Sequence, residues 1–95
     1  RGVAGAEEPD GAWSDYAIEL GVLIHRTRIA KALSQERVAY ESGLSRYTYQ
    51  KLERGHSTPG RPANPTIKTL IAVSQALGVD ISDILPNRPP DLRAR

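Results

Sequence analysis

The feature that most constrains this chain is a pair of short helix signals separated by about three residues around Gly43. Ser34 and Ser45 each precede a helix-forming run, and a hydroxyl there can accept a hydrogen bond from a free backbone N–H of the first turn. Gly43 follows the first run, where glycine readily adopts the left-handed conformation that ends a helix. The pattern predicts helices over 35–42 and 46–54. So short a connection makes the two axes cross steeply, as in a helix-turn-helix, whose second helix can enter a DNA major groove.

Helical patterning repeats on both sides of this pair, so the sequence predicts an all-α fold of five short helices. The first begins at Ser14 or Asp15 and runs to about Ala32. A fourth follows the capping residue Asn64, and a last short one follows the capping residue Asp80. No stretch shows the alternation rich in Val, Ile and Thr that is typical of strands.

The chain divides into one domain and two tails. Its 95 residues are enough for one small domain, which we place at 14–86, with the helix-turn-helix at about 35–54. Residues 1–13 are rich in Gly, Ala and acids and lack periodicity, so they are predicted to form a disordered acidic tail. Residues 87–95 are predicted to be a second disordered tail.

Charge is distributed unevenly along the chain. Residues 1–20 carry one Arg and five acidic residues, whereas residues 21–68 carry nine Lys or Arg and three acidic residues. A basic middle of this kind is typical of a surface that binds a polyanion. The alternative, on charge alone, is an ordinary solvated helical surface.

Several classes of function are excluded or disfavoured by composition. The chain has no Cys, so disulfides and thiolate metal sites are excluded. His25 and His56 stand alone, so we predict no metal site. The Ser residues that stand out serve as helix caps, so we predict no enzyme and no cofactor. No apolar stretch approaches the ~18 residues of a membrane span, and the acidic N-terminus is unlike a signal peptide.

The outward face of the helix predicted at 46–54 carries the chemistry of DNA recognition. It presents five polar or cationic side chains, namely Arg46, Tyr47, Gln50, Lys51 and Arg54. Arg and Lys donate hydrogen bonds to guanine O6 and N7, and Gln pairs with adenine N6 and N7. A tyrosine can stack, contact a thymine methyl group or bind a phosphate.

The sequence resembles the lambda-repressor-like helix-turn-helix family, which includes the phage repressor and Cro proteins. The resemblance covers about residues 20–85 and rests on several marks in register. These marks are Leu33-Ser34-Gln35, Ala39, Gly43, Leu44-Ser45-Arg46, Leu52-Glu53-Arg54-Gly55, Thr69-Leu70 and Ala76-Leu77-Gly78-Val79.

The resemblance implies a role for each matching position. Side chains of the second helix of the pair would read bases, and these are Arg46, Tyr47 and Lys51, with Gln50 beside them. Other side chains would contact phosphates, and these are Gln35, Arg54, Arg61 and Asn64. Gln35 would also brace the base-reading side chains. Arg28 and Glu53 would form an internal salt bridge that sets the angle of the recognition helix.

The chain also departs from the family pattern. Arg37 replaces the Glu that commonly closes a capping box, and Ser42 stands where an apolar residue is usual. Tyr49 replaces a β-branched aliphatic residue, and Thr27 a common Leu. The loop 56–64 is several residues longer than in most of the family, so the resemblance does not place its side chains relative to DNA.

The function expected from these features is that of a sequence-specific regulator of transcription, a repressor that binds double-stranded DNA. The family usually binds as a homodimer on a near-palindromic site. We expect a cytoplasmic protein of a bacterium or phage, associated with the nucleoid. The alternative is an antitoxin-type or other protein-interaction module on the same fold. Val22 and Ile29, seven residues apart in the first helix, could form a face for such a protein partner.

Overall fold

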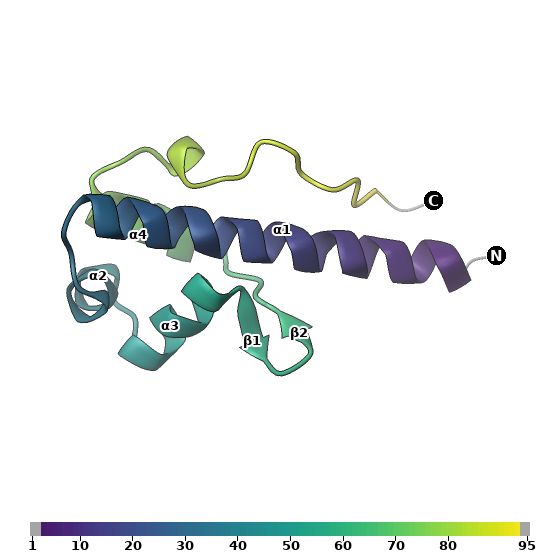
Figure 1. The fold of residues 1–95 in the computed structure, drawn as a ribbon, viewed down its shortest axis with the longest axis horizontal. Coiled ribbons are helices and arrows are strands. Elements are labelled where there is room, and N and C mark those ends of the chain that lie inside the picture. Colours follow the sequence, from purple (N-terminus) through teal and green to yellow (C-terminus); the bar gives the residue numbers. More distant parts are fainter. Residues whose placement is uncertain (1–2, 94–95) are drawn as a thin grey trace.

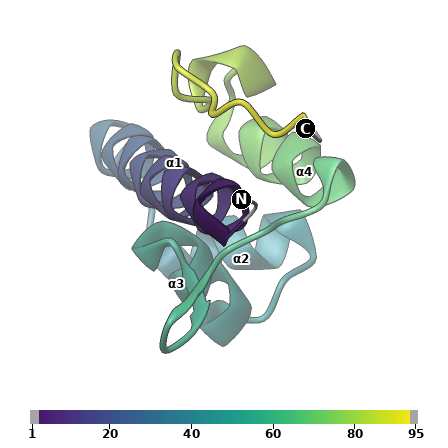
Figure 2. The same cartoon turned by 90° about the vertical axis from the view of Figure 1, so that its right-hand side faces the viewer.

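The computed structural model describes residues 3–93, with side chains from residue 11 onward. A long helix, α1 (Val3–Ala30), runs the length of the molecule, which measures 47 × 25 × 20 Å. On one side of α1 lie α2 (Gln35–Ser42), α3 (Arg46–Arg54) and a hairpin of β1 (His56–Thr58) and β2 (Arg61–Pro62). Helix α4 (Ile67–Leu77) packs against α2, and a 3₁₀ turn, η1 (Ile81–Asp83), follows it. Figure 2 looks obliquely along α1, with α3 below it and α4 to its right.

The predicted helix pair is confirmed with its boundaries. The Ser34 hydroxyl accepts a hydrogen bond from the Arg37 N–H at 3.0 Å, and the Ser45 hydroxyl accepts one from the Thr48 N–H at 3.0 Å. Gly43 ends α2 with a φ of +74°, a conformation that costs glycine little. The all-α class is also confirmed, since the described strands amount to one short hairpin.

The N-terminal prediction differs from the structure. Helix α1 begins at Val3, so residues 3–13 are helical where a disordered tail was expected; residues 1–2 lie outside the described part. The composition of this stretch does not explain the helix, because Ala and Glu favour one whereas Gly5, Pro9 and Gly11 disfavour it. Trp13 anchors α1 near this end, because its indole N–H donates to the Ala63 carbonyl at 3.0 Å. Its ring also lies 5.6 Å from that of Tyr16 on the same helix. The bond to Ala63 joins residues fifty apart and is absent from any local pattern.

Corrections also apply to the helix count and to the start of α4. Among residues 3–93 there are four α-helices instead of five, because the turn after Asp80 is a single 3₁₀ turn. The cap of α4 is Thr66, whose hydroxyl accepts from the Thr69 N–H, and not Asn64. Residues 63–66 form neither helix nor strand, and Ala63 is bound elsewhere, since it donates to the Gly55 carbonyl and accepts from the Trp13 indole N–H.

The core forms where the helices meet, and α1 crosses the C-terminal end of α3 at very close range. A Cβ atom on Gly21 would lie only 2.4 Å from the Glu53 carbonyl oxygen, so no larger residue fits without a backbone shift. The fully buried side chains come from α1, α2, α3, α4 and the segment after η1; the largest are Tyr49, Leu20, Ile24, Leu77, Ile84, Val38 and Val73. This crossing brings the end of α3 beside α1, where the polar centre described below is formed.

The C-terminal segment, as far as it is described, contains neither helix nor strand between residues 87 and 93. Just before it, the Tyr16 hydroxyl donates a hydrogen bond to the Pro86 carbonyl at 3.1 Å, which ties the end of the domain to α1. None of the described helices is both long and apolar enough to cross a membrane.

Candidate nucleic-acid interface

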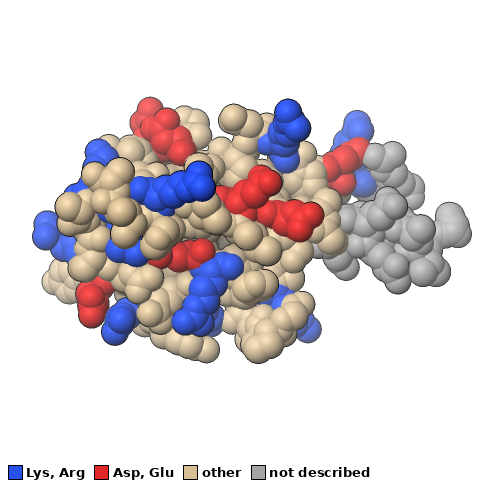
Figure 3. All heavy atoms as spheres, in the orientation of Figure 1, with Lys and Arg blue, Asp and Glu red and all other residues tan. Residues whose placement is uncertain are grey.

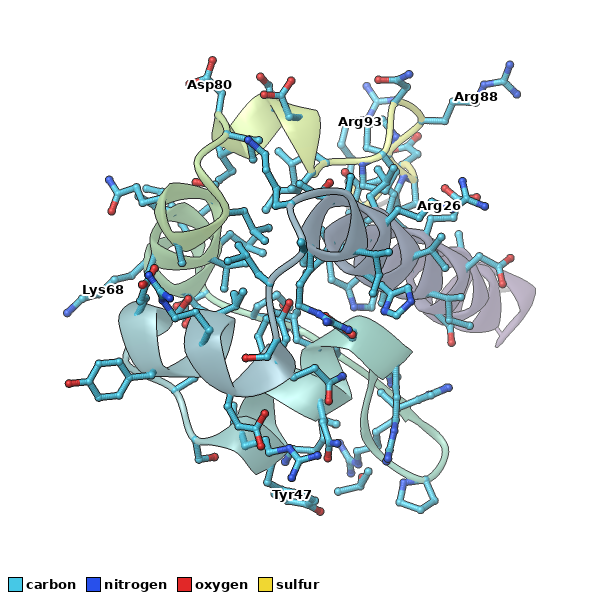
Figure 4. The ribbon with its side chains drawn as sticks, turned by 60° about the vertical axis from the view of Figure 1, so that its left-hand side comes forward. Arg26, Tyr47, Lys68, Asp80, Arg88 and Arg93 are labelled. Carbon is cyan, nitrogen blue, oxygen red and sulfur yellow. The ribbon has the colours of Figure 1, made fainter. Side chains whose placement is uncertain are left out.

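Helix α3 is amphipathic and turns its polar side away from the core. Tyr49 and Leu52 are buried, whereas Arg46, Tyr47 and Arg54 are exposed. The Tyr47 side chain, 65% exposed, lies at the edge of the molecule and points away from it (Figure 4). In Figure 3, Lys and Arg side chains are spread along the edge formed by α3 and the hairpin. This edge can approach a polyanion without removing any side chain from the core.

Two contacts hold the outward side chains of α3 loosely in place. The Lys51 ammonium lies 4.6 Å from the centre of the Tyr47 ring, a cation–π contact within one helix face. Arg46 Nη1 lies 3.6 Å from Glu36 Oε2, and both side chains are more than half exposed. An exposed pair of this length contributes little to stability, so Arg46 can leave Glu36 at little cost to bind another acceptor.

Gln50 is placed differently from the exposed Arg46 and Tyr47. It is half-buried, and its amide nitrogen donates a hydrogen bond to Gln35 Oε1 at 3.2 Å. The sequence resemblance implied that Gln35 braces base-reading side chains in general. In the structure the contact runs to Gln50, while Arg46 contacts Glu36.

A buried carboxylate at the end of α3 is the centre of the polar network. Glu53 is 5% exposed at its side chain and lies 2.6 Å from Arg28 Nε, the two residues that the resemblance paired. It also accepts hydrogen bonds from the Tyr49 hydroxyl at 2.6 Å and from Gln35 Nε2 at 3.0 Å, and His25 Nδ1 lies 3.0 Å away. One carboxylate therefore joins α1, the start of α2 and α3.

The network keeps this carboxylate ionised. Burial alone would raise the pKa of Glu53, but the hydrogen bonds it accepts outweigh that effect and lower its pKa to about 2; the donors are Arg28, Tyr49, His25 and Gln35. Burial, together with the bond to Glu53, raises the pKa of Tyr49, so its hydroxyl remains a donor. Arg28 makes a further bond, from Nη1 to the Leu33 carbonyl at 2.8 Å, which fixes the turn before α2.

The residues expected at phosphates lie on either side of α3. Gln35 begins α2, and the exposed Arg54 ends α3. Arg61 begins β2, and Asn64 follows the hairpin; both are exposed. Among the described side chains, no carboxylate forms an ion pair with Arg54 or Arg61. Both arginines therefore keep their donors available.

Three features of this surface were not found from the sequence. The loop after α3 forms a hairpin, with Gly60 at a φ of +79° in its tip. The Tyr49 hydroxyl and the His25 ring both reach Glu53. Only Tyr49 left a signal, since it departs from the family pattern and lies four residues before Glu53, on the same helix face.

Comparison with known proteins places the fold in a family. A helix-turn-helix family model matches residues 24–84. The chain belongs to the Cro/C1-type helix-turn-helix family. The resemblance inferred from the sequence is thereby confirmed, and the members found by comparison are transcription regulators.

Individual members of the family show how far the likeness extends. The uncharacterized HTH-type transcriptional regulator y4dJ of Sinorhizobium fredii (strain NBRC 101917 / NGR234) is 44% identical over 54 residues. That match covers 57% of this chain and 62% of the relative, so the chain spans less than two thirds of it.

Solved structures resemble the chain over most of its length. The restriction-modification controller protein C.AhdI from Aeromonas hydrophila has a TM-score of 0.64 at 28% identity, covering 73% of this chain and 96% of the other. The clp gene regulator ClgR from Corynebacterium glutamicum also has a TM-score of 0.64, at 25% identity, covering 73% of this chain and 82% of the other. Among the side chains of residues 11–93, no group of three or more His, Cys, Asp or Glu could hold a metal ion.

Proposed function

We propose that this member of the family is a sequence-specific regulator of transcription, a cytoplasmic protein that inserts α3 into the major groove of duplex DNA. The observation that carries the proposal is the two-sided character of α3. One side is fixed to α1 and α2 through Glu53, while the other presents Arg46 and Lys51, which make only an exposed ion pair with Glu36 and a contact with the Tyr47 ring. A rigidly held helix whose outward donors are only weakly engaged can read base edges, because the position of the helix is set before binding.

The side chains proposed to touch DNA divide into those that contact bases and those that contact phosphates. Arg46, Tyr47, Gln50 and Lys51 lie toward the groove and read bases. Phosphate contacts fix the register without reading sequence, and we assign them to Gln35, Arg54, Arg61 and Asn64. Arg28 and Glu53 hold the angle of α3 and do not touch DNA.

Regulation by such a domain follows from occupancy of the site. A homodimer on a near-palindromic operator, with half-sites about 34 Å apart, would exclude other proteins from that stretch of DNA. We therefore propose repression by occlusion as the mode of action. Two similar proteins are named as regulators: C.AhdI as a restriction-modification controller and ClgR as a clp gene regulator.

Two substitutions test this division into base contacts and phosphate contacts. Arg46→Ala should lower affinity for the preferred duplex about 5- to 150-fold and relax the preference at one base position. Arg54→Ala should weaken binding to all duplexes alike and make the salt dependence shallower by about one unit of log–log slope. Arg88→Ala, at an exposed arginine of the C-terminal segment, is the control and should change neither quantity. Equal losses on specific and random DNA for both variants would contradict the assignment.

A protein-interaction role remains the second candidate, because α1 carries exposed apolar side chains. Ile18 and Val22 are each 39% exposed and Ile29 is 56% exposed, all on one helix. Gel filtration with and without duplex DNA at low salt separates the two candidates. A monomer that leaves the DNA unshifted would favour the interaction role and contradict DNA binding.

A further inference from the structure

A cleft of about 330 Å³ opens where α1 meets the start of α2 and the end of α3. It is lined by three residues that the proposed function places against DNA, namely Gln35, Gln50 and Arg54. The remaining lining residues are Val22, His25, Arg26 and Glu53. His25 has no part in the proposed function, although its side chain is 51% exposed and borders this cleft. The cleft therefore joins a titratable side chain without a role to the side of the molecule proposed to face DNA.

The charges around the cleft favour an anion. The buried carboxylate of Glu53 is neutralised by Arg28, whose Nε lies 2.6 Å from it. Arg26 and Arg54 are exposed, and among the described side chains neither forms an ion pair with a carboxylate. These two arginines leave the cleft with a net positive charge, and guanidinium donors suit the oxygens of a phosphate group.

The buried network fixes the orientation of the His25 ring. Its Nδ1 lies 3.0 Å from Glu53 Oε1 and 3.3 Å from Arg28 Nη2. An ionised carboxylate can only accept a hydrogen bond, and Arg28 can only donate one. Because Arg28 Nη2 already donates to Glu53 Oε1 at 3.2 Å, we assign the ring proton to Nδ1, which then donates to Glu53. Nε2 is the ring nitrogen left for another ligand.

His25 is the group in this cleft whose charge can change near neutral pH. The charged and titratable groups around it are Arg26 and Arg28 of α1 and Tyr49, Glu53 and Arg54 of α3, while the start of α2 contributes the neutral Gln35. Arginines keep their charge in this range. Hydrogen bonds lower the pKa of Glu53 to about 2, and burial raises that of Tyr49. An imidazole, in contrast, can gain its second proton between about pH 5 and 8.

We propose that the cleft binds a phosphate group of the DNA backbone, which accepts hydrogen bonds from Arg54 and from Nε2 of a protonated His25. A neutral ring with its proton on Nδ1 has only a lone pair at Nε2, which cannot donate to a phosphate oxygen. Binding therefore takes up one proton from solvent at His25, and affinity for DNA rises as the pH falls. A free phosphate-bearing molecule presents the same chemistry, so the experiment includes both sources.

The DNA arm of the test rests on the proposed function and uses a duplex selected from a random library. Anisotropy titrations at about pH 6 and about pH 8 span several salt concentrations. Wild-type affinity should be about ten-fold higher at the lower pH, because a charge-assisted hydrogen bond is gained. The slope of log affinity against log salt should also be steeper there by about 0.9, because one more cation meets a phosphate.

The two histidines of the chain supply the variant and its matched control. His25→Gln can still donate to Glu53 but cannot gain a charge, so its affinity and salt slope should be the same at both pH values. His56→Gln, at the exposed histidine of β1, should keep the wild-type pH dependence. Circular dichroism should show both variants folded at both pH values, since neither replaces a buried side chain. Wild-type binding that ignores pH, or a pH dependence that persists in His25→Gln, would overturn the role of His25.

The second arm uses inorganic phosphate and no DNA, so it can succeed or fail independently of the proposed function. Phosphate is titrated into the protein at about pH 6 while NMR follows the ring protons of His25. They should shift with saturation in the wild type and lose that response in Arg54→Ala. If no duplex is bound at either pH, the proposed function fails, and a saturable shift would assign the cleft to a free phosphate-bearing ligand. No saturable shift and no pH-dependent DNA binding would overturn the phosphate site altogether.

Discussion

Replacing Glu53 by Gln tests how much its buried carboxylate stabilises the packing of α3 against α1 and α2. The substitution preserves shape but replaces one oxygen with an NH₂ group. Whichever oxygen is lost, the new NH₂ faces donors: Oε2 receives Arg28 Nε and the Tyr49 hydroxyl, and Oε1 receives Arg28 Nη2 and Gln35. Glu53→Gln therefore removes the charge partner of Arg28 and sets like groups against each other.

The expected loss of stability follows from burial. Side-chain exposure is 5% for Glu53 and 9% for Arg28, and removing one partner of a buried ion pair costs about 3–5 kcal/mol because the other charge stays buried. A small domain has a free energy of unfolding of about 5–15 kcal/mol, so this is a large share. Urea unfolding followed by circular dichroism measures the change.

The control is the exposed pair of Arg37 with Glu41 on α2. Glu41→Gln breaks an ion pair of the same chemical type at the surface and should leave the urea midpoint unchanged. A Glu53→Gln protein that is unfolded without urea would agree with the account. A Glu53→Gln midpoint equal to that of Glu41→Gln would refute the reasoning that burial makes this carboxylate decisive.

Two further predictions concern packing and pH. Gly21→Ala should lower the free energy of unfolding in urea by about 1–3 kcal/mol, because its Cβ would meet the backbone of α3. Gly11→Ala, whose Cβ would have nothing within 4 Å, should raise it by about 0.5–1 kcal/mol. Equal effects of the two substitutions would contradict the close crossing of α1 and α3. The pKa of Glu53 falls from 4.5 to about 2 on folding, so its contribution is present above pH 4.5 and is lost as pH falls toward 2. The stability difference between wild type and Glu53→Gln should shrink over that range; a constant difference would contradict the prediction.

The central part of the fold could be predicted because its signals are local. Ser34, Gly43, Ser45 and Gly55 each act within one helical turn, and they gave α2 and α3 their boundaries. The extension of α1 could not be predicted in this way. Trp13 is anchored to Ala63, fifty residues away, and a composition rich in Gly and acids indicates disorder when that contact is unknown.

The hairpin and the polar network could not be predicted either, because both depend on contacts between residues far apart in the sequence. Strands of two and three residues are too short to carry an alternating pattern, and they form here because their flanking residue Ala63 is held by the Gly55 carbonyl and by Trp13. For the candidate site, sequence reasoning could name Gln35 and Gln50 but not their contact. That contact joins α2 to α3, and Gln35 also donates to Glu53, so both bonds form only once these helices have packed together.

The most direct test of the central claim is selection of binding sites by the wild-type protein from a library of random duplexes, followed by anisotropy titration of the selected duplex and a scrambled one. The account predicts one enriched motif, at least 10³-fold tighter binding than to the scrambled duplex, and affinity that falls linearly with salt on a log–log plot. No enrichment, or equal and salt-independent binding to both duplexes, would contradict a role for α3 in reading DNA.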